Sequence, residues 1–330
     1  PLLRLASFLH LRSPHTDQNW LSASDISNFL ALAECEVVTR GRKLLFPIPF
    51  PLISTLLNRY IANIPIINAL CLVNYIVARP QQHPLLKRED ELSVSIVVPA
   101  RNEAGTIQKI IDELPTLGSF TELIFIEGNS TDNTRTEIEK CVAAYHGPKR
   151  LLWGVQDGRG KGDAVRKGFK MATGDILMIY DADMTVPPNE IERFYTAITS
   201  GQGEFINGSR LTYPMEKESM RLLNFVSIKC FGLLFSSILG QKMKDTLCGT
   251  KVLSRKDYDN IIAGRSFFGD FDPFGDFDLL FGAAKLNRKI VDLPVHYKER
   301  KYGSTNISRF RHGWLLIKML IFAARKIKFT

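Results

Sequence analysis

Hydrophobic and polar positions alternate between two patterns in the middle of the chain. Short apolar, β-branched runs such as SVSIVVPA (93–100) and TELIFIEG (121–128) predict buried strands. Each run is followed by apolar residues at helical spacing, at 103–114 and 133–144. The alternation continues with RLLWGV, GDAVRKGFKMA and DILMIYDAD at 150–155, 162–172 and 175–183. Alternating strands and helices predict right-handed βαβ units, and therefore an α/β fold whose parallel sheet has helices on both faces.

The first eighty residues follow a different pattern. Ser22, Ser24 and Asp25 are candidate caps of a short amphipathic helix, which a short strand around Val37 and Val38 follows. A proline-broken apolar stretch and a β-branched strand come next. This order in residues 1–80 resembles the C-terminal end of a class I S-adenosylmethionine-dependent methyltransferase, whose cofactor loop would lie upstream. The alternative is an N-terminal extension that packs on the main domain. The polar, charged residues 81–91 are the predicted linker.

Composition narrows the class of protein. The chain has 330 residues, of which 45% are hydrophobic and 23% charged, so it can bury a sizeable core. A formal net charge of +9 favours anionic partners such as nucleotides, lipid phosphates, a membrane face or nucleic acid. The five cysteines are scattered and form no CxxC pair, which predicts a reducing, cytoplasmic setting and neither a disulfide framework nor a zinc knuckle.

The loops after the predicted strands carry the polar groups. In parallel sheets of this kind, ligands bind at the carboxyl ends of the strands. Asn102, Glu103 and Asp132 offer donors and acceptors to a base or ribose. The glycines of QDGRGKGD (156–163) leave room for phosphates near a helix start, and Lys161 adds positive charge there. These loops suit a nucleoside diphosphate.

Two acids end the run ILMIYDADMTVPP (176–188). Asp181 and Asp183 are alternate residues after a buried strand, so both can face one divalent cation. Carboxylate ligands favour Mg²⁺ or Mn²⁺. The double proline at 187–188 then predicts the end of the strand and a stiff turn into a helix.

Several ordered motifs together resemble one enzyme family. VSIVVPARNEAGTI, IEGNSTDNT, GRGKGDAVRKGF and GDILMIYDADMTVPP resemble the successive motifs of family 2 glycosyltransferases of the GT-A fold. INGSR, KDTLCGTKVLSR and residues 275–307 are similar to the later motifs of the dolichyl-phosphate mannose synthase and glucosyltransferase branch. The resemblance covers residues 92–310. It implies a GT-A fold with a mostly parallel sheet between helices, preceded by a small N-terminal α/β segment.

The resemblance implies roles for individual residues. Those implied for nucleoside binding are Pro99, Asn102, Glu103, Glu127 and Asp132, although Gly128 stands where the family usually has a second acid. Asp181 and Asp183 match the metal and diphosphate motif. Arg210, Asp245 and Gly249, the last in a tight turn, match positions beside the donor sugar and the acceptor phosphate. Arg300 and the loop 301–305, with Ser304, match the stretch that closes over the diphosphate; Lys161, Arg210 and Arg300 are candidates to offset its charge.

The acceptor decides whether a general base is needed. A hydroxyl acceptor requires one, for which Asp278 is the best match and Asp276 the second. An ionised phosphate is already a nucleophile at neutral pH. We therefore expect inverting transfer from a GDP- or UDP-sugar to a polyprenyl or dolichyl phosphate, with the hydroxyl acceptor of a polysaccharide or glycolipid as the alternative.

Two apolar stretches predict contact with a membrane. Residues 222–240 contain only Lys229 as a charge, and residues 311–330 form a predicted amphipathic helix with a basic end. The second is too short and too basic to span a bilayer and suits the interface. The alternative for the first is a buried core helix. We expect a peripheral protein on the cytoplasmic face of a membrane; the pattern does not distinguish a monomer from an oligomer.

Two other readings are weaker. YDADMT (180–185) satisfies the DxDxT signature of haloacid-dehalogenase phosphatases, but that signature belongs after a domain's first strand. RFRHGW (309–314) combines basic and aromatic residues without a recognised nucleic-acid-binding module around it. We therefore expect no nucleic-acid partner.

Overall fold

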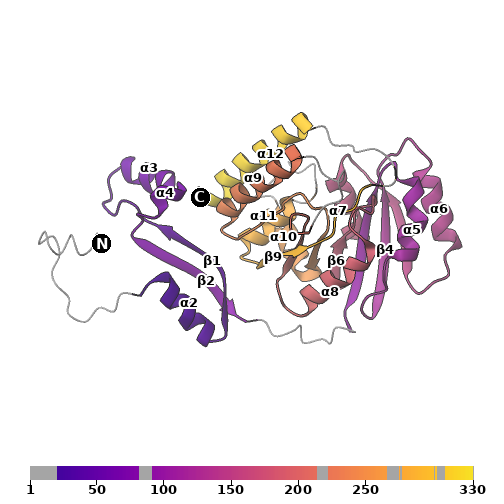
Figure 1. The fold of residues 1–330 in the computed structure, drawn as a ribbon, viewed down its shortest axis with the longest axis horizontal. Helices are drawn as coiled ribbons and strands as arrows, with labels where there is room; N and C mark the ends of the chain where they lie inside the picture. The colour runs from indigo at the N-terminus through magenta and orange to yellow at the C-terminus, as the bar shows by residue number, and fades with distance from the viewer. Residues whose placement is uncertain are drawn as a thin grey trace, which may run out of the picture.

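The chain folds around two β-sheets (Figure 1). The computed structural model describes residues 21–81, 91–213, 222–265, 275, 277–300, 302 and 309–329. Strands β1 (Cys35–Lys43) and β2 (Val73–Pro80) form a two-stranded antiparallel sheet. The other sheet has seven strands in the order β5-β4-β3-β6-β8-β7-β9.

The larger sheet is mostly parallel, as predicted. Its strands are β3 (Ser93–Ala100), β4 (Phe120–Glu127), β5 (Arg150–Val155), β6 (Ile176–Ile179), β7 (Phe205–Ser209), β8 (Lys251–Ser254) and β9 (Ile290–Pro294). Only β8 runs antiparallel to its neighbours, β6 and β7. Successive residues of β3 face opposite sides, so Ile96 and Val98 join one core and Val97 the other.

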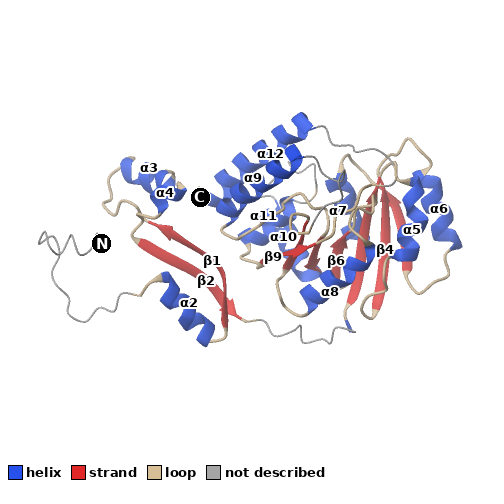
Figure 2. Cartoon of the chain, in the orientation of Figure 1, coloured by secondary structure: helices blue, strands red, loops and turns tan. Residues whose placement is uncertain are grey.

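Helices cover both faces of this sheet (Figure 2). Helices α5 (Ile107–Glu113), α6 (Thr134–Ala144) and α8 (Ile191–Thr199) pack on one face. The other face carries α7 (Lys161–Met171), α9 (Leu222–Leu239), α10 (Arg255–Ala263), α11 (Phe277–Lys285) and α12 (Arg309–Ala323). The predicted α/β sandwich is confirmed.

Two elements are shorter than predicted, both next to the loops that carry chemistry. Strand β6 ends at Ile179, so Asp181 and Asp183 lie in the turn beyond it, where Met184 has a left-handed φ of 54°. Helix α5 begins only at Ile107, after a 3₁₀ turn. The backbone NH of Glu103 donates to Thr134 Oγ1 (2.8 Å), which holds this segment in a loop. At the start of α5, a hydrogen bond to a residue distant in sequence takes the place of the expected helical hydrogen bond.

The N-terminal unit is built from α2 (Ala23–Leu32), β1, α3 (Ile53–Arg59), η1 (Ile61–Asn63), α4 (Pro65–Asn68) and β2. Ser22 is the N-cap of α2: its Oγ accepts from the NH of Asp25 (3.2 Å), whose carboxylate accepts from the NH of Ser22 (2.7 Å). This reciprocal capping box agrees with the predicted helix start. Strand β1 is longer than the predicted strand around Val37 and Val38.

Polar contacts join the N-terminal unit to the larger one. Glu36 of β1 pairs with Arg79 of β2 (2.6 Å) and with Lys289, which precedes β9. Thr39 Oγ1 donates to the carbonyl oxygen of Gly240 at the end of α9 (2.9 Å). The two units therefore pack through β1.

Helices α9 and α12 each have a buried and an exposed apolar face. In α9, Phe235 and Leu239 are buried, whereas Leu233 is 74% exposed. In α12, Met319 is buried and Trp314 is 58% exposed. Among the described residues, no helix combines the length and the apolarity that crossing a bilayer requires.

Candidate active site

Four carboxylates from the predicted loops meet at the carboxyl edge of the sheet. Glu103 follows β3, Asp132 follows β4, and Asp181 and Asp183 follow β6. Burial, opposed by Arg300 and reinforced by the negative charges of Asp183, Asp132 and Asp181, raises the pKa of Glu103 to about 7. The acids are therefore close enough to repel one another, as the predicted convergence of the loops requires.

Two basic side chains, those of Lys161 and Arg300, lie among these acids. Lys161 Nζ, at the start of α7, is 2.6 Å from Asp181 Oδ1. Arg300 bridges Asp183 (2.8 Å to Oδ2) and Glu103 (2.9 Å to Oε1). Burial alone would raise the pKa of Asp181, but the positive charges around it, chiefly that of Lys161, hold the pKa below its ordinary value. This edge of the sheet therefore combines basic side chains that can bind phosphate with carboxylates that can bind a metal ion.

The donor atoms at this edge suit a hard divalent cation. Asp181 and Asp183 offer carboxylate oxygens, and the buried Glu103 Oε2 has no hydrogen-bond partner within the described ranges of the chain. In the described part of the chain, no group of three or more His, Cys, Asp or Glu side chains is arranged to hold a metal. Asp183 Oδ1 accepts from the NH and hydroxyl of Thr185, which orient it (3.1 and 2.9 Å). The two aspartates are of the residue type that binds a divalent cation. In this structure Lys161 pairs with Asp181, and Arg300 pairs with Asp183.

Arg210 and Asp245 form a buried, bidentate ion pair. Arg210 Nε and Nη2 donate to the two carboxylate oxygens of Asp245 (2.7 and 2.9 Å). The ring of Tyr297 lies 5.2 Å from the guanidinium carbon. Burial opposes the charge of Asp245, yet Arg210 holds its pKa below the ordinary value. The ion pair fixes the position of the guanidinium, and its charge also helps to lower the pKa of Asp181.

Gly249 lies against the centre of the site. A Cβ atom built there would overlap with the Asp181 carboxylate and would lie 2.5 Å from Lys161 Nζ. Gly249 is absent from the described glycines with positive φ, so the expected tight turn is not what requires glycine here. The requirement is space for the Asp181–Lys161 pair.

The residues predicted to bind the nucleoside also tie two loops together. Asn102 has a left-handed φ of 58°, and its Oδ1 accepts from the NH of Thr131 (2.8 Å). Glu127 Oε1 accepts from the NH of Ser130 (2.6 Å), and Asp132 Oδ1 from the NH of Thr134 (2.9 Å). Pro99 lies in β3 opposite Ile126. The Asn102–Thr131 bond joins the loop after β3 to the loop after β4, and the other two bonds stabilise the loop after β4.

Asp278 lies in the first turn of α11, with Arg166 and Arg265 nitrogens each 3.9 Å from its Oδ2. Gly275 packs directly on Gly162 at the start of α7, which brings this segment next to Lys161. Asp276 and Ser304, both predicted to act at the site, lie outside the described residues.

Lys251 was not among the residues predicted for the site. It is fully buried in β8, where its Nζ donates to Asn207 Oδ1 (2.9 Å) and to the carbonyl oxygen of Cys248 (2.5 Å). Its charge helps to lower the pKa of Asp181. The available signal was a lysine inside the apolar run TKVL (250–253), since lysine is rarely buried without a role.

The family model described as "Glycosyl transferase family 2" matches residues 95–262, which hold β3 to β8 and the acids above. The chain belongs to this family. The membership sets aside the phosphatase reading of Asp181 and Asp183.

Curated relatives of this family-2 chain come from archaea and bacteria. They include "Glycosyltransferase AglD" and "Glycosyltransferase AglJ" of Haloferax volcanii, 26% and 28% identical over 71% and 68% of the chain. An "Undecaprenyl-phosphate 4-deoxy-4-formamido-L-arabinose transferase" of Enterobacter sp. is 25% identical over 66% of it. The alignments cover 38%, 69% and 63% of these relatives' own lengths.

The fold is shared with solved structures. Glucosyl-3-phosphoglycerate synthase from Mycobacterium tuberculosis, in complex with Mn²⁺, UDP and glucosyl-3-phosphoglycerate, matches with a TM-score of 0.52 and 19% identity. The match covers 72% of this chain and 80% of that one. The GT-A fold predicted from the sequence is thereby confirmed.

Proposed function

We propose that this family-2 chain transfers a sugar, with inversion, from a GDP- or UDP-sugar to a polyprenyl or dolichyl phosphate. The observation that carries the proposal is the convergence of Glu103, Asp132, Asp181 and Asp183 with Lys161 and Arg300 at one sheet edge. Mixed charges of this kind can hold a diphosphate together with its counter-ion.

Asp181 and Asp183 would hold Mg²⁺ or Mn²⁺. When bound, the cation neutralises negative charge on the diphosphate leaving group. Lys161 and Arg300, which are now paired with the two aspartates, would bind phosphate oxygens. The Mn²⁺ and UDP named for the mycobacterial structure support this assignment. Pro99, Asn102 and Glu127 are proposed to border the nucleoside, because their loops frame the same edge.

The acceptor phosphate would be bound on the other side of Asp181, near Arg210, Asp245 and Gly249. Its oxygen attacks the anomeric carbon from the face opposite the diphosphate; the new C–O bond forms as the bond to the leaving group breaks. Arg210 is already oriented by Asp245 and can donate to the incoming phosphate. The undecaprenyl-phosphate transferase among the relatives supports a lipid phosphate.

The environment of Asp278 favours the phosphate acceptor over a hydroxyl. To act as a general base, its carboxylate would have to turn from Arg166 and Arg265 toward the acceptor. An ionised phosphate needs no such step. Asp276 and Ser304 remain proposed participants by resemblance alone.

Membrane contact is proposed through the exposed apolar faces of α9 and α12. Leu233, Trp314 and Ile321 are exposed on these helices. The basic residues Arg325, Lys326 and Lys328 follow α12. Apolar side chains beside basic ones suit an anionic membrane surface, here proposed as the cytoplasmic face. We also keep the proposal that residues 1–80 end a methyltransferase-like unit: α2 followed by the antiparallel pair β1–β2 agrees with it.

Purified protein would test the proposed reaction with Mn²⁺ and a panel of UDP- and GDP-sugars, with and without a short polyprenyl phosphate. Product that forms only with the lipid phosphate would establish the donor and the acceptor. Metal-dependent donor hydrolysis without lipid transfer would move the acceptor to a hydroxyl and the base to Asp278. No reaction with any donor would contradict the proposal.

A further inference from the structure

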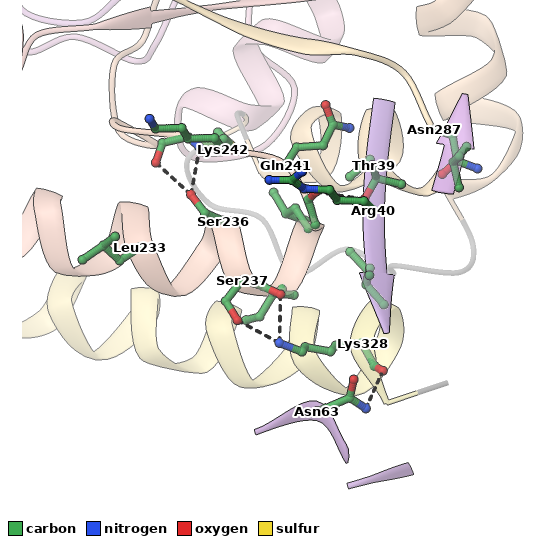
Figure 3. A pocket seen from close by; sticks show the side chains of 18 of the residues that line it. Thr39, Arg40, Asn63, Leu233, Ser236, Ser237, Gln241, Lys242, Asn287 and Lys328 are labelled. Atoms are coloured by element: carbon green, nitrogen blue, oxygen red, sulfur yellow. Dashed lines mark hydrogen bonds between the residues drawn. The ribbon is translucent and has the colours of Figure 1, made fainter. Parts of the chain in front are cut away.

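A second site lies between the N-terminal unit and the helical face of the larger sheet. A cavity of about 1230 Å³ is bounded by β1, the C-terminal half of α9 with the loop after it, and the turn after α12 (Figure 3). None of the predicted active-site residues that the structure describes lines it. The cavity is therefore distinct from the carboxyl edge.

All charged residues of the lining are basic. Among the described residues that line the cavity, nine are lysine or arginine and none is aspartate or glutamate. The chain as a whole has 43 basic and 34 acidic residues, so a wall without acidic side chains does not follow from composition. The nine are Arg40, Arg42, Lys43, Lys229, Lys242, Lys244, Lys285, Lys326 and Lys328.

Several of these side-chain charges form no ion pair with a carboxylate of the described residues. In the part of the chain that the structure describes, Arg40, Lys242 and Lys244 form no ion pair with an acidic side chain. Lys328 Nζ instead donates to the carbonyl and hydroxyl oxygens of Ser237 on α9 (2.9 and 2.8 Å), as Figure 3 shows. Partial burial lowers the pKa of Lys328. Like charges gathered around one hollow favour an anion within it.

Neutral donors complete the wall. The side chains of Asn63 and Gln241 lie on opposite sides of the cavity (Figure 3), and Ser237 lies on α9. A guanidinium, ammonium groups, amides and a hydroxyl are the set that binds phosphate oxygens. Leu233, which is 74% exposed, adds an apolar margin.

We propose that this basic cavity binds an anion that carries phosphate charge, at a site separate from the donor diphosphate. Its volume is ample for a diphosphate or a phospholipid headgroup. A soluble phosphate compound and an anionic lipid share this chemistry. Because β1 supplies Arg40, Arg42 and Lys43, binding would couple the N-terminal unit to α9 and the C-terminal turn.

The test compares the full chain with the variant Arg40→Glu/Lys242→Glu. One arm titrates sodium pyrophosphate by calorimetry; the other measures sedimentation with vesicles of equimolar phosphatidylcholine and phosphatidylglycerol. The matched control, Lys109→Glu/Lys140→Glu, reverses two exposed charges on α5 and α6. Pyrophosphate also binds any donor site, which is unchanged in all three proteins. Should the reversed variant not fold, Arg40→Gln/Lys242→Gln replaces it.

We expect the cavity variant to lose one class of anion site, with affinity at least about tenfold weaker, since each charged hydrogen bond contributes about that factor. Loss in the pyrophosphate arm alone identifies a soluble phosphate; loss in the vesicle arm alone identifies a headgroup. Unchanged binding in both arms, or an equal loss in the control, overturns the proposal.

Discussion

Buried acids at the two ends of the central sheet differ in their hydrogen bonding. At the amino ends of the strands, Glu122 is fully buried and accepts from Ser95 Oγ (2.6 Å), from Thr173 NH (2.8 Å) and Oγ1 (2.9 Å), and from Arg150 (3.2 Å). At the carboxyl ends, Glu103 is almost as buried, but its Oε2 has no hydrogen-bond partner among the described residues. Burial, together with the charges of the neighbouring acids, raises its pKa to about 7.

The difference separates structural from functional polarity. The carboxylate oxygens of Glu122 accept hydrogen bonds from several donors, as expected of a buried acid with a structural role. Glu103, Asp181 and Asp183 share Lys161 and Arg300 and repel one another, an arrangement that costs stability and suits a charged ligand. Substitutions at the two ends should therefore affect different measurements.

The largest effect is expected from Asp183→Asn. It removes a charged oxygen from the proposed cation site while keeping the shape of the side chain. Sugar transfer with Mn²⁺ should fall on the order of a thousandfold, with a thermal midpoint close to that of the parent. Asp259→Asn, exposed on α10, is the control and should transfer normally. Undiminished turnover of Asp183→Asn would remove the metal assignment.

At the opposite end, Glu122→Ala should act on stability alone. It leaves the Ser95 hydroxyl and the Thr173 NH without their buried acceptor, and we expect the free energy of unfolding to fall by about 3 kcal/mol. Denaturant titration measures this, and transfer per folded molecule should be unchanged. Glu113→Ala breaks only an exposed helical pair and should cost less than about 0.5 kcal/mol. Equal costs for the two variants would contradict the structural role of Glu122.

Glu103→Gln should change how stability depends on pH. The folded protein binds the Glu103 proton more tightly than the unfolded chain, because its pKa rises from 4.5 to about 7. Parent stability is thus progressively lost as pH rises from about 4.5 through 7. In EDTA, Glu103→Gln should be more stable than the parent at pH 8, by up to about 3 kcal/mol, and nearly equal to it at pH 4. Glu139→Gln, exposed on α6, should show no such difference; a pH-independent gap for Glu103→Gln would exclude the raised pKa.

A pair of glycines provides the smallest and most specific contrast. The Cβ of Gly249→Ala would press on Asp181 and Lys161, whereas that of Gly174→Ala would lie 2.7 Å from the backbone nitrogen of Ser95. We expect Gly249→Ala to lose transfer about tenfold, or about 1.4 kcal/mol, with little change in melting. Gly174→Ala should lower stability by about 1 kcal/mol and transfer normally. If both variants changed the same measurement, the two ends would not be functionally distinct.

Much of the fold was predictable because the strands are local and strongly patterned. The runs at 93–100 and 150–155 coincide with β3 and β5. The continuous apolar, β-branched run of β3 suits a central, buried strand, whereas β5 lies at the edge of the sheet and is only partly buried. Element ends near the site were predicted less well. Strand β6 is shorter than the strand predicted from the sequence: Tyr180 NH still donates to Val97 O of β3, but Met184 NH donates to Asp181 O and closes the turn that carries Asp181 and Asp183.

The types of residue at the site were predictable from the sequence, but the ion pairs and hydrogen bonds that they form were not. The acids and Lys161 follow strands or begin a helix, and that alone places them at one edge. The link between Glu103 and Asp183 depends on Arg300, which is more than a hundred residues from Asp183 in the chain. Lys251 was missed because a buried lysine in an apolar strand can be interpreted only when its neighbours are known.

The α/β alternation, the family motifs and the charged loops can be predicted from the sequence, because each depends on contiguous residues. Three further features require the folded chain: Gly249 leaves space beside Asp181, one oxygen of Glu103 has no hydrogen-bond partner among the described residues, and β1 closes a basic cavity against α9. These features arise between segments far apart in the chain. Side-chain distances and burial set their energies, and neither is encoded in local periodicity.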